Sequence, residues 1–221
     1  MQVTEQQNAL LQKHLALVVE ANETTNITRI DSIERAQILH IEDSLVAWEE
    51  LLAAPSGLYG DLGSGAGYPG IPLAIVSGRE TLLVESVKKK AHLLEHFSQE
   101  LGLSSQISVF DGRAEELAAS HRNSFSVLSA RALSKLGSLM ELASPLLTIG
   151  GQLICYKAHI EDEEMETAQR LKNTLGLELL SDRDLYLSDS QTYRRIVVFQ
   201  KFKNASIKLP SRNGMAQRQP L

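Results

Sequence analysis

Residues 61 to 72 read DLGSGAGYPGIP, and the glycines in this stretch have the spacing of a cofactor-binding loop. Gly65, Gly67 and Gly70 fit the pattern G-x-G-x-x-G, in which backbone amides contact the pyrophosphate of a dinucleotide. Read from Asp61, the same stretch fits D-x-G-x-G-x-G, which is typical of methyltransferases that bind S-adenosylmethionine. The spacing therefore predicts a cofactor loop and leaves two cofactors open.

Two acidic residues near the loop bear on this choice. Glu85 lies about 20 residues further on, where an acid binds ribose hydroxyls, and both cofactors carry such hydroxyls. Asp61 would place an anion beside a pyrophosphate, whereas the ammonium group of S-adenosylmethionine would find a counter-ion there. We therefore favour S-adenosylmethionine and keep a nicotinamide-dependent oxidoreductase as the alternative.

The hydrophobic pattern indicates which elements position these residues. From Leu58 onward, short apolar runs alternate with helical patterns, which predicts a mostly parallel sheet covered on both faces. The last two apolar runs are too close for a crossover helix, so they pair antiparallel. A seven-stranded α/β sheet of this kind is the Rossmann-like arrangement of class I methyltransferases. The strands are expected at residues 58–62, 81–86, 107–110, 125–130, 150–158, 177–187 and 194–202.

The first part of the chain shows helical patterns only. Thr4 and Gln7 have the spacing of a capping box that opens one helix, and Asp31 and Glu34 repeat it for a second helix that reaches about Leu52. We therefore divide the chain into three parts. These are a helical appendage (1–55), an S-adenosylmethionine-binding domain (56–203) and a basic tail (204–221).

The composition is that of a soluble, cytoplasmic protein, which we expect to be a monomer. The single cysteine, Cys155, cannot form an internal disulfide, and the chain has neither a signal-peptide pattern nor an apolar run of membrane-spanning length. The net charge of -5 is segregated, because no acidic residue follows Asp189. Seven basic residues lie beyond that point, namely Arg194, Arg195, Lys201, Lys203, Lys208, Arg212 and Arg218.

Four stretches together resemble one family over nearly the whole chain. DLGSGAGYPGIPLAI, RAEEL, SARAL and LHIEDSL are similar to the bacterial glucose-inhibited division protein B family, and the last residues follow its basic tail ending in Pro-Leu. The family uses S-adenosylmethionine to methylate N7 of a guanine in small-subunit ribosomal RNA. The resemblance implies cofactor contacts at Gly63, Tyr68, Ala114, Glu115 and Arg131.

The resemblance also directs attention to two residues on the second predicted helix. His40 and Asp43 are three positions apart and share a helix face, which by spacing alone favours a surface hydrogen-bond pair. As a family feature, this face would border the target base with Arg131, and Asp43 would stabilise the cationic product. Guanine N7 already has a free lone pair, so we predict no general base.

The expected partner is small-subunit ribosomal RNA, naked or in an assembling small subunit. Lys88–Lys90, Arg131 and the tail from Lys201 to Arg218 are the expected RNA contacts, so removing the residues after Phe202 should weaken RNA binding and spare the cofactor. A catalytically silent RNA-binding module is the alternative from another class. The H-x-x-E-H pattern at His92–His96 lacks a third ligand motif, and we predict no metal site.

Overall fold

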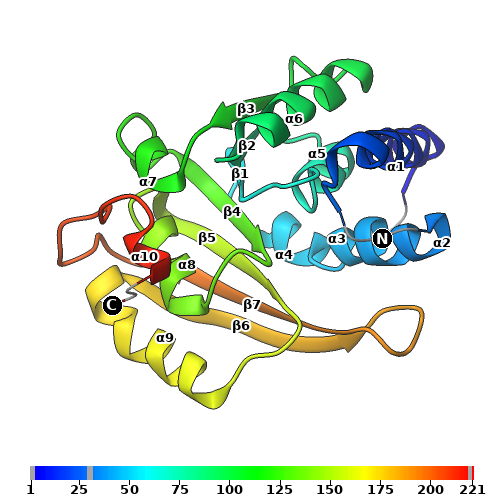
Figure 1. Cartoon of the computed structure of the whole chain (residues 1–221). Coiled ribbons are helices and arrows are strands. Elements are labelled where there is room, and N and C mark those ends of the chain that lie inside the picture. Colours follow the sequence, from blue (N-terminus) through cyan, green and yellow to red (C-terminus); the bar gives the residue numbers. More distant parts are fainter. Residues whose placement is uncertain (1–2, 29–31, 219–220) are drawn as a thin grey trace.

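A seven-stranded sheet forms the centre of the computed structural model, which describes residues 3–28, 32–218 and 221 (Figure 1). The strand order is β3-β2-β1-β4-β5-β7-β6, with β1 to β5 parallel and β7 antiparallel to both of its neighbours. The predicted fold class is therefore confirmed. The strands are β1 (Leu58–Leu62), β2 (Thr81–Glu85), β3 (Ile107–Asp111), β4 (Phe125–Arg131), β5 (Leu147–Lys157), β6 (Leu177–Tyr186) and β7 (Tyr193–Lys201).

Helices cover both faces of the sheet, and each face has its own hydrophobic core. Side chains alternate between the faces along each strand, so Ile154 of β5 joins one core and Cys155 joins the other. One face carries α1 (Glu5–Thr25), α2 (Ile33–Ala36), η1 (Gln37–Glu42), α3 (Asp43–Leu45), α4 (Trp48–Ala53), α5 (Gly70–Ser77) and α6 (Lys88–Glu100). The other face carries α7 (Ala114–Leu117), α8 (Leu136–Ala143), α9 (Asp162–Leu175) and α10 (Met215–Arg218).

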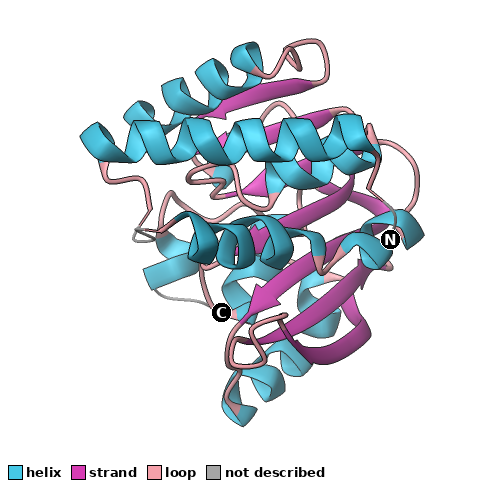
Figure 2. Cartoon of the chain, turned by 90° about the vertical axis from the view of Figure 1, so that its right-hand side faces the viewer, coloured by secondary structure: helices cyan, strands magenta, loops and turns pink. Residues whose placement is uncertain are grey.

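The first helix is anchored on the sheet domain. The predicted capping box is confirmed, with the Thr4 hydroxyl accepting from the Gln7 amide and the Gln7 side chain accepting from the Thr4 amide. Gln7 also donates to the carbonyl of Val76 at the end of α5. Figure 2 shows α1 lying broadside across the molecule, where its apolar stripe of Leu11, Leu15 and Val18 is buried.

The second predicted helix is not continuous, which corrects the expectation of one helix to about Leu52. It is divided into α2, the π-helical turn η1, α3 and α4. The Ser44 hydroxyl donates to the carbonyl of His40, and the Tyr156 hydroxyl donates to the carbonyl of Ser44. Side chains that compete for backbone carbonyls in this way break the regular helical ladder. Asp31 lies outside the described residues, and Ser32 caps α2.

Asp61 lies beneath the glycine loop and holds it to the sheet. Its side chain is 1% exposed, and its two oxygens accept from the Gly70 amide (3.2 Å) and the Ser129 hydroxyl (2.5 Å). A β-carbon on Gly70 would lie 2.7 Å from Asp61 Oδ2, so only glycine fits there. Both oxygens of Asp61 thus bind groups of the protein, and its role as a counter-ion for a ligand stays a prediction. Burial raises the pKa of Asp61 to about 6.

We predict that Asp61→Asn changes how stability depends on pH. Because the pKa of Asp61 is higher in the folded state, wild-type stability falls as pH rises from about 4 to about 6 and the asparagine variant lacks this loss. Relative to wild type, the free energy of unfolding of the variant should increase by about 2 kcal/mol between pH 4.5 and pH 7.5 in urea titrations. Asp184→Asn, an exposed carboxylate on β6, should show little change; equal pH dependence in both variants would contradict the assignment.

Candidate functional site

Two cavities lie side by side at the carboxyl ends of the parallel strands, where ligands bind in doubly wound sheets. The loop after β4 separates them, with Ala132 lining one and Leu133 lining the other. The small cavity has a volume of about 220 Å³ and is lined by Gly63, Val84, Ser86, Gly112, Arg113, Ala114, Glu115, Leu133, Leu142 and Gln217. The large cavity has a volume of about 440 Å³ and is lined by Leu39, His40, Asp43, Arg131, Ala132, Ser134, Leu139, Tyr156, Lys157, Ala158, His159 and Arg194.

The glycine loop borders the small cavity and leaves an open cradle at one position. Gly63, Gly65 and Gly67 all have left-handed backbone angles, with φ of +73°, +58° and +92°. A β-carbon on Gly63 would lie 2.8 Å from Leu133, and one on Gly67 would lie 2.6 Å from Ile71. A β-carbon on Gly65 would have the backbone oxygen of Gly63 as its nearest neighbour, at 3.9 Å. Protein atoms thus fill the space at two glycines, while Gly65 faces open space.

Glu85 supports this loop from the end of β2. Its Oε2 accepts from the Gly65 amide at 2.9 Å, its Oε1 accepts from the Val87 amide at 2.8 Å, and the residue is 6% exposed. Each oxygen binds one amide of the chain's own backbone, and contact of Glu85 with ribose hydroxyls stays a prediction. Glu85 therefore fixes the direction in which the open side of the loop faces.

Tyr68 lies in a stack of rings that connects the N-terminal helices to the loop. Its ring is parallel to that of His40 at 4.3 Å, His14 lies 4.5 Å away, and the Arg131 guanidinium is 5.8 Å from the ring centroid. Tyr68 is 4% exposed, and among the described residues its hydroxyl has no hydrogen-bond partner. The expected cofactor residue is thus packed between α1 and η1 at the edge of the loop.

His14 is a site residue that sequence reasoning missed. It is fully buried, and burial lowers its pKa to about 3, so the ring is neutral. Its Nε2 donates to the carbonyl of Ala66 in the glycine loop at 3.0 Å, because a carbonyl can only accept. The sequence feature that could have identified it is the position of this histidine on the apolar stripe of α1, directly before Leu15. Burial of a polar ring at such a position requires a partner.

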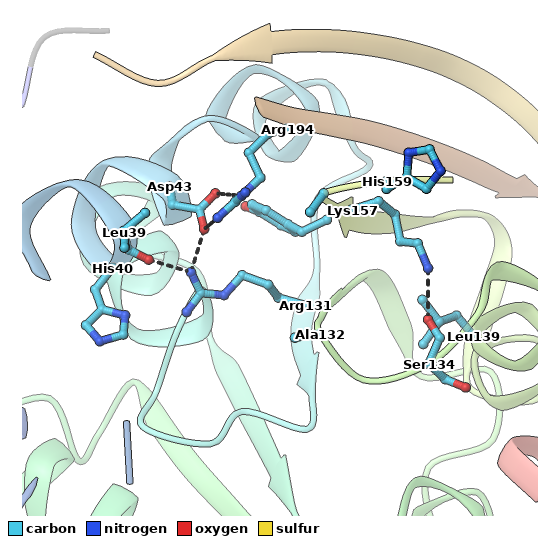
Figure 3. A pocket seen from close by; sticks show the side chains of 12 residues that line it. Leu39, His40, Asp43, Arg131, Ala132, Ser134, Leu139, Lys157, His159 and Arg194 are labelled. Carbon is cyan, nitrogen blue, oxygen red and sulfur yellow. Dashed lines mark hydrogen bonds and ion pairs between the residues drawn. The ribbon is translucent and has the colours of Figure 1, made fainter. Parts of the chain in front are cut away.

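One buried carboxylate organises the large cavity (Figure 3). Asp43 is 1% exposed; it accepts from Arg131 Nη1 at 2.8 Å and from Arg194 Nε and Nη2 at 2.7 and 3.2 Å. Arg131 Nη1 also donates to the carbonyl of Leu39 at 3.0 Å. Two guanidinium groups share one carboxylate, so the cluster has a net charge of +1. We call Asp43, Arg131 and Arg194 the arginine cluster.

The structure brings the predicted trio of His40, Asp43 and Arg131 to one cavity and adds Arg194 from β7. His40 is neutral near pH 7, because burial, and then the neighbouring Arg131, lowers its pKa to about 4. Both oxygens of Asp43 are paired with arginines, and its role in stabilising a cationic product stays a prediction. Sequence analysis placed Arg194 in the last strand, among the basic residues that follow Asp189, and only the position of β7 brings it to this cavity.

The expected RNA and cofactor residues toward the C-terminus differ in exposure. Ala114 and Glu115 line the small cavity, and their contact with a cofactor stays a prediction. Lys88 and Lys89 are exposed at the start of α6. Lys201 is 1% exposed and donates to Asn123 Oδ1 and to two backbone carbonyls, which corrects its expected role in RNA binding. Burial lowers the pKa of Lys201 to about 8.

Two further features concern the part of the chain that the structure describes. This part of the chain contains no group of three or more histidine, cysteine, aspartate or glutamate side chains that could hold a metal ion. Its helices also lack the combination of length and hydrophobicity that a membrane span requires.

Solved structures share this arrangement of strands and helices. Precorrin-6y C5,15-methyltransferase from Geobacter metallireducens matches 72% of this chain and 88% of its own length, with a TM-score of 0.55 at 11% identity. Cofactor-bound Rv0187 from MTB matches 86% and 90%, with a TM-score of 0.59 at 17% identity. The protein therefore has the class I methyltransferase fold.

Sequence comparison defines the family. The GidB model, described as rRNA small subunit methyltransferase G, matches residues 7–191. Proteins named Ribosomal RNA small subunit methyltransferase G are 33% identical in Carboxydothermus hydrogenoformans (96% of this chain, 91% of the relative) and 31% identical in Lysinibacillus sphaericus (100% and 93%). The chain belongs to the rRNA small subunit methyltransferase G family, which confirms the resemblance seen in the sequence. The oxidoreductase alternative is not favoured.

We predict that Asp43 contributes more to stability than either of its partners. Asp43→Ala leaves two guanidinium groups without their shared carboxylate and should lower the free energy of unfolding by about 3 kcal/mol, whereas Arg194→Ala leaves one pair intact and should cost about 1 kcal/mol. Asp182→Ala, which breaks a more exposed pair with Arg195, gives the scale of a surface interaction in the same urea titrations. Equal losses in all three variants would argue against a central role for Asp43.

Proposed function

We propose that this protein transfers a methyl group from S-adenosylmethionine to N7 of a guanine in small-subunit ribosomal RNA. The observation that carries the proposal is the pair of adjoining cavities at the carboxyl ends of the strands, in a chain of this family. One cavity borders an open glycine cradle, and the other carries the positive arginine cluster. Family membership supplies the reaction class, and the geometry supports where each substrate lies.

The small cavity and the glycine loop fit the methyl donor. S-adenosylmethionine supplies an electrophilic methyl group on a sulfonium. At about 220 Å³, the small cavity is below the roughly 300–1,000 Å³ of complete small-molecule sites, so it fits the adenosine part. Gly63, Ala114 and Glu115 would border that part, and the space above Gly65 would hold the remainder toward Tyr68 and Arg131. In this assignment Asp61 and Glu85 act through the loop.

The large cavity fits a single nucleobase turned out of its stack. Its volume of about 440 Å³ lies within the range for ligand sites. The net positive charge of the arginine cluster favours an RNA phosphate at its rim. Within the described residues, Arg131 uses only its Nη1 for hydrogen bonds, which leaves Nη2 and Nε for RNA. Arg131 would thus contact both substrates between the two cavities.

The residues of the large cavity would orient the base and not remove a proton. Guanine N7 attacks with a lone pair that it already has, so catalysis rests on alignment and electrostatics. His40 stays neutral through the physiological range and stacks on Tyr68. Asp43 is a positioning residue that holds the two arginines.

The proposal also includes the setting of the reaction. The partner is small-subunit ribosomal RNA, either free or within an assembling particle, and the protein acts as a cytoplasmic monomer. Lys88 and Lys89 at the start of α6 and the basic residues of the tail add exposed positive charge to the surface. RNA affinity would therefore fall steeply with salt, as counterions are released from the phosphates.

We predict that Gly65→Ala weakens binding of S-adenosylmethionine, because the new methyl group enters the only open space beside the loop glycines at 63, 65 and 67. Gly78→Ala is a matched control, since Gly78 has a similar φ of +67° and nothing within 4 Å. Both variants should lose about 1 kcal/mol of stability to backbone strain. Only Gly65→Ala should bind the donor about tenfold or more weakly in calorimetry. Equal affinity in the two variants would remove the cradle from the site.

We predict that methyl transfer depends little on pH and forms 7-methylguanosine. With unmodified small-subunit ribosomal RNA and tritiated S-adenosylmethionine, the single-turnover rate should change less than about threefold between about pH 6 and pH 8.5, because no group must lose a proton. Nucleoside analysis identifies the product. A rate that rises tenfold per pH unit, or a methyl group on an exocyclic amine, would sink this mechanism. Donor binding without transfer to RNA would instead support a silent RNA-binding module.

A further inference from the structure

The end of the chain folds back onto the methyltransferase domain. In Figure 1 the red segment lies beside α7 and α8, and α10 is part of it. Leu209 and Ala216 are 4% and 1% exposed and belong to the hydrophobic core on that face of the sheet. Two buried apolar side chains fix the segment at both ends. We call residues 209–218 the docked tail.

Hydrogen bonds attach the docked tail to the elements that surround the small cavity. The Gly214 amide donates to Glu115 Oε1 at 2.6 Å, and Asn213 donates to Glu116 Oε1 at 2.5 Å. Glu115 is 7% exposed, so its carboxylate takes a backbone amide of the tail as a buried partner. Hydrogen bonds to a charged acceptor are stronger than neutral ones. The tail is thus held directly at a residue of the cavity wall.

Gln217 brings the docked tail into the cavity itself. It lines the small cavity together with Gly63 and Ala114, which come from the loops after β1 and β3. Gln217 is exposed, so its amide is accessible to a ligand. A glutamine amide offers a donor and an acceptor side by side, which matches the amino group and ring nitrogen at the edge of an adenine.

We propose that residues 211–217 form the outer wall of the adenosine site and that the Gln217 amide contacts the adenine edge. This inference rests on the proposed function, because it takes the small cavity as the site of the donor's adenosine. It reverses the expectation that removing the residues after Phe202 spares the cofactor. A segment that looks like an RNA-binding tail by charge would also determine how tightly the methyl donor is held.

The test measures binding of S-adenosylhomocysteine to the full chain by calorimetry, without RNA. Gly214→Pro removes the amide that bonds Glu115 and forbids the φ of +75°, so it should release the wall and weaken affinity about tenfold. Gln217→Ala should weaken affinity about threefold, through the loss of one or two hydrogen bonds. Gln99→Ala is the matched control and should bind like wild type, because Gln99 is an exposed glutamine on α6 that does not line the cavity.

A second measurement is independent of the variants. Hydrogen exchange of the wild-type protein should slow at residues 211–217 when S-adenosylhomocysteine binds. Wild-type affinity in both Gly214→Pro and Gln217→Ala, or unchanged exchange in the tail, would overturn the proposal. If Gly214→Pro does not fold, the affinity of Gln217→Ala and the exchange data test the proposal by themselves. A wild-type protein that does not bind S-adenosylhomocysteine at all would contradict the proposed function, which is a distinguishable failure.

Discussion

A single buried carboxylate joins three distant segments of this protein. Asp43 follows the π-helical turn, Arg131 ends β4, and Arg194 lies on β7, so one side chain connects the N-terminal helices with both the parallel and the antiparallel parts of the sheet. A charge that is 1% exposed is tolerated only when it is paired and hydrogen-bonded, and here two guanidinium groups meet that condition. The walls of the large cavity depend on this contact, and the N-terminal helices are therefore part of the site.

Buried polar side chains also hold the glycine loop in position. Asp61 holds it from below, Glu85 bonds its amide at Gly65, and His14 bonds its carbonyl at Ala66. These groups satisfy buried backbone atoms that would otherwise lack partners. Each comes from a different element, so three separate parts of the chain hold the loop in place. A preorganised loop does not have to be ordered by its ligand, so more of the binding energy remains available.

The charge of the chain and the charge of its site have opposite signs. The net charge is -5, yet the large cavity contains the arginine cluster with its net charge of +1. Ions interact over distances of about 10 Å at moderate salt, so an RNA phosphate would respond to the local cluster and not to the sum over the chain. Overall acidity is consequently compatible with an RNA substrate.

The sequence by itself determined the strands and the glycine turn, because both depend on local backbone geometry. Side-chain alternation, helical periodicity and glycine spacing are properties of a few neighbouring residues, and all seven strands and the turn after β1 follow from them. The open space at Gly65 was decided by the tertiary structure, because side chains from other parts of the chain fill the space at Gly63 and Gly67. Tertiary structure decided which group each side chain contacts. Burial of Lys201, the pairing of Arg194 with Asp43 and the docking of Gly214 on Glu115 join residues 54 to 151 positions apart. Such contacts depend on strand order and on the competition for buried partners, and a local pattern carries no record of either.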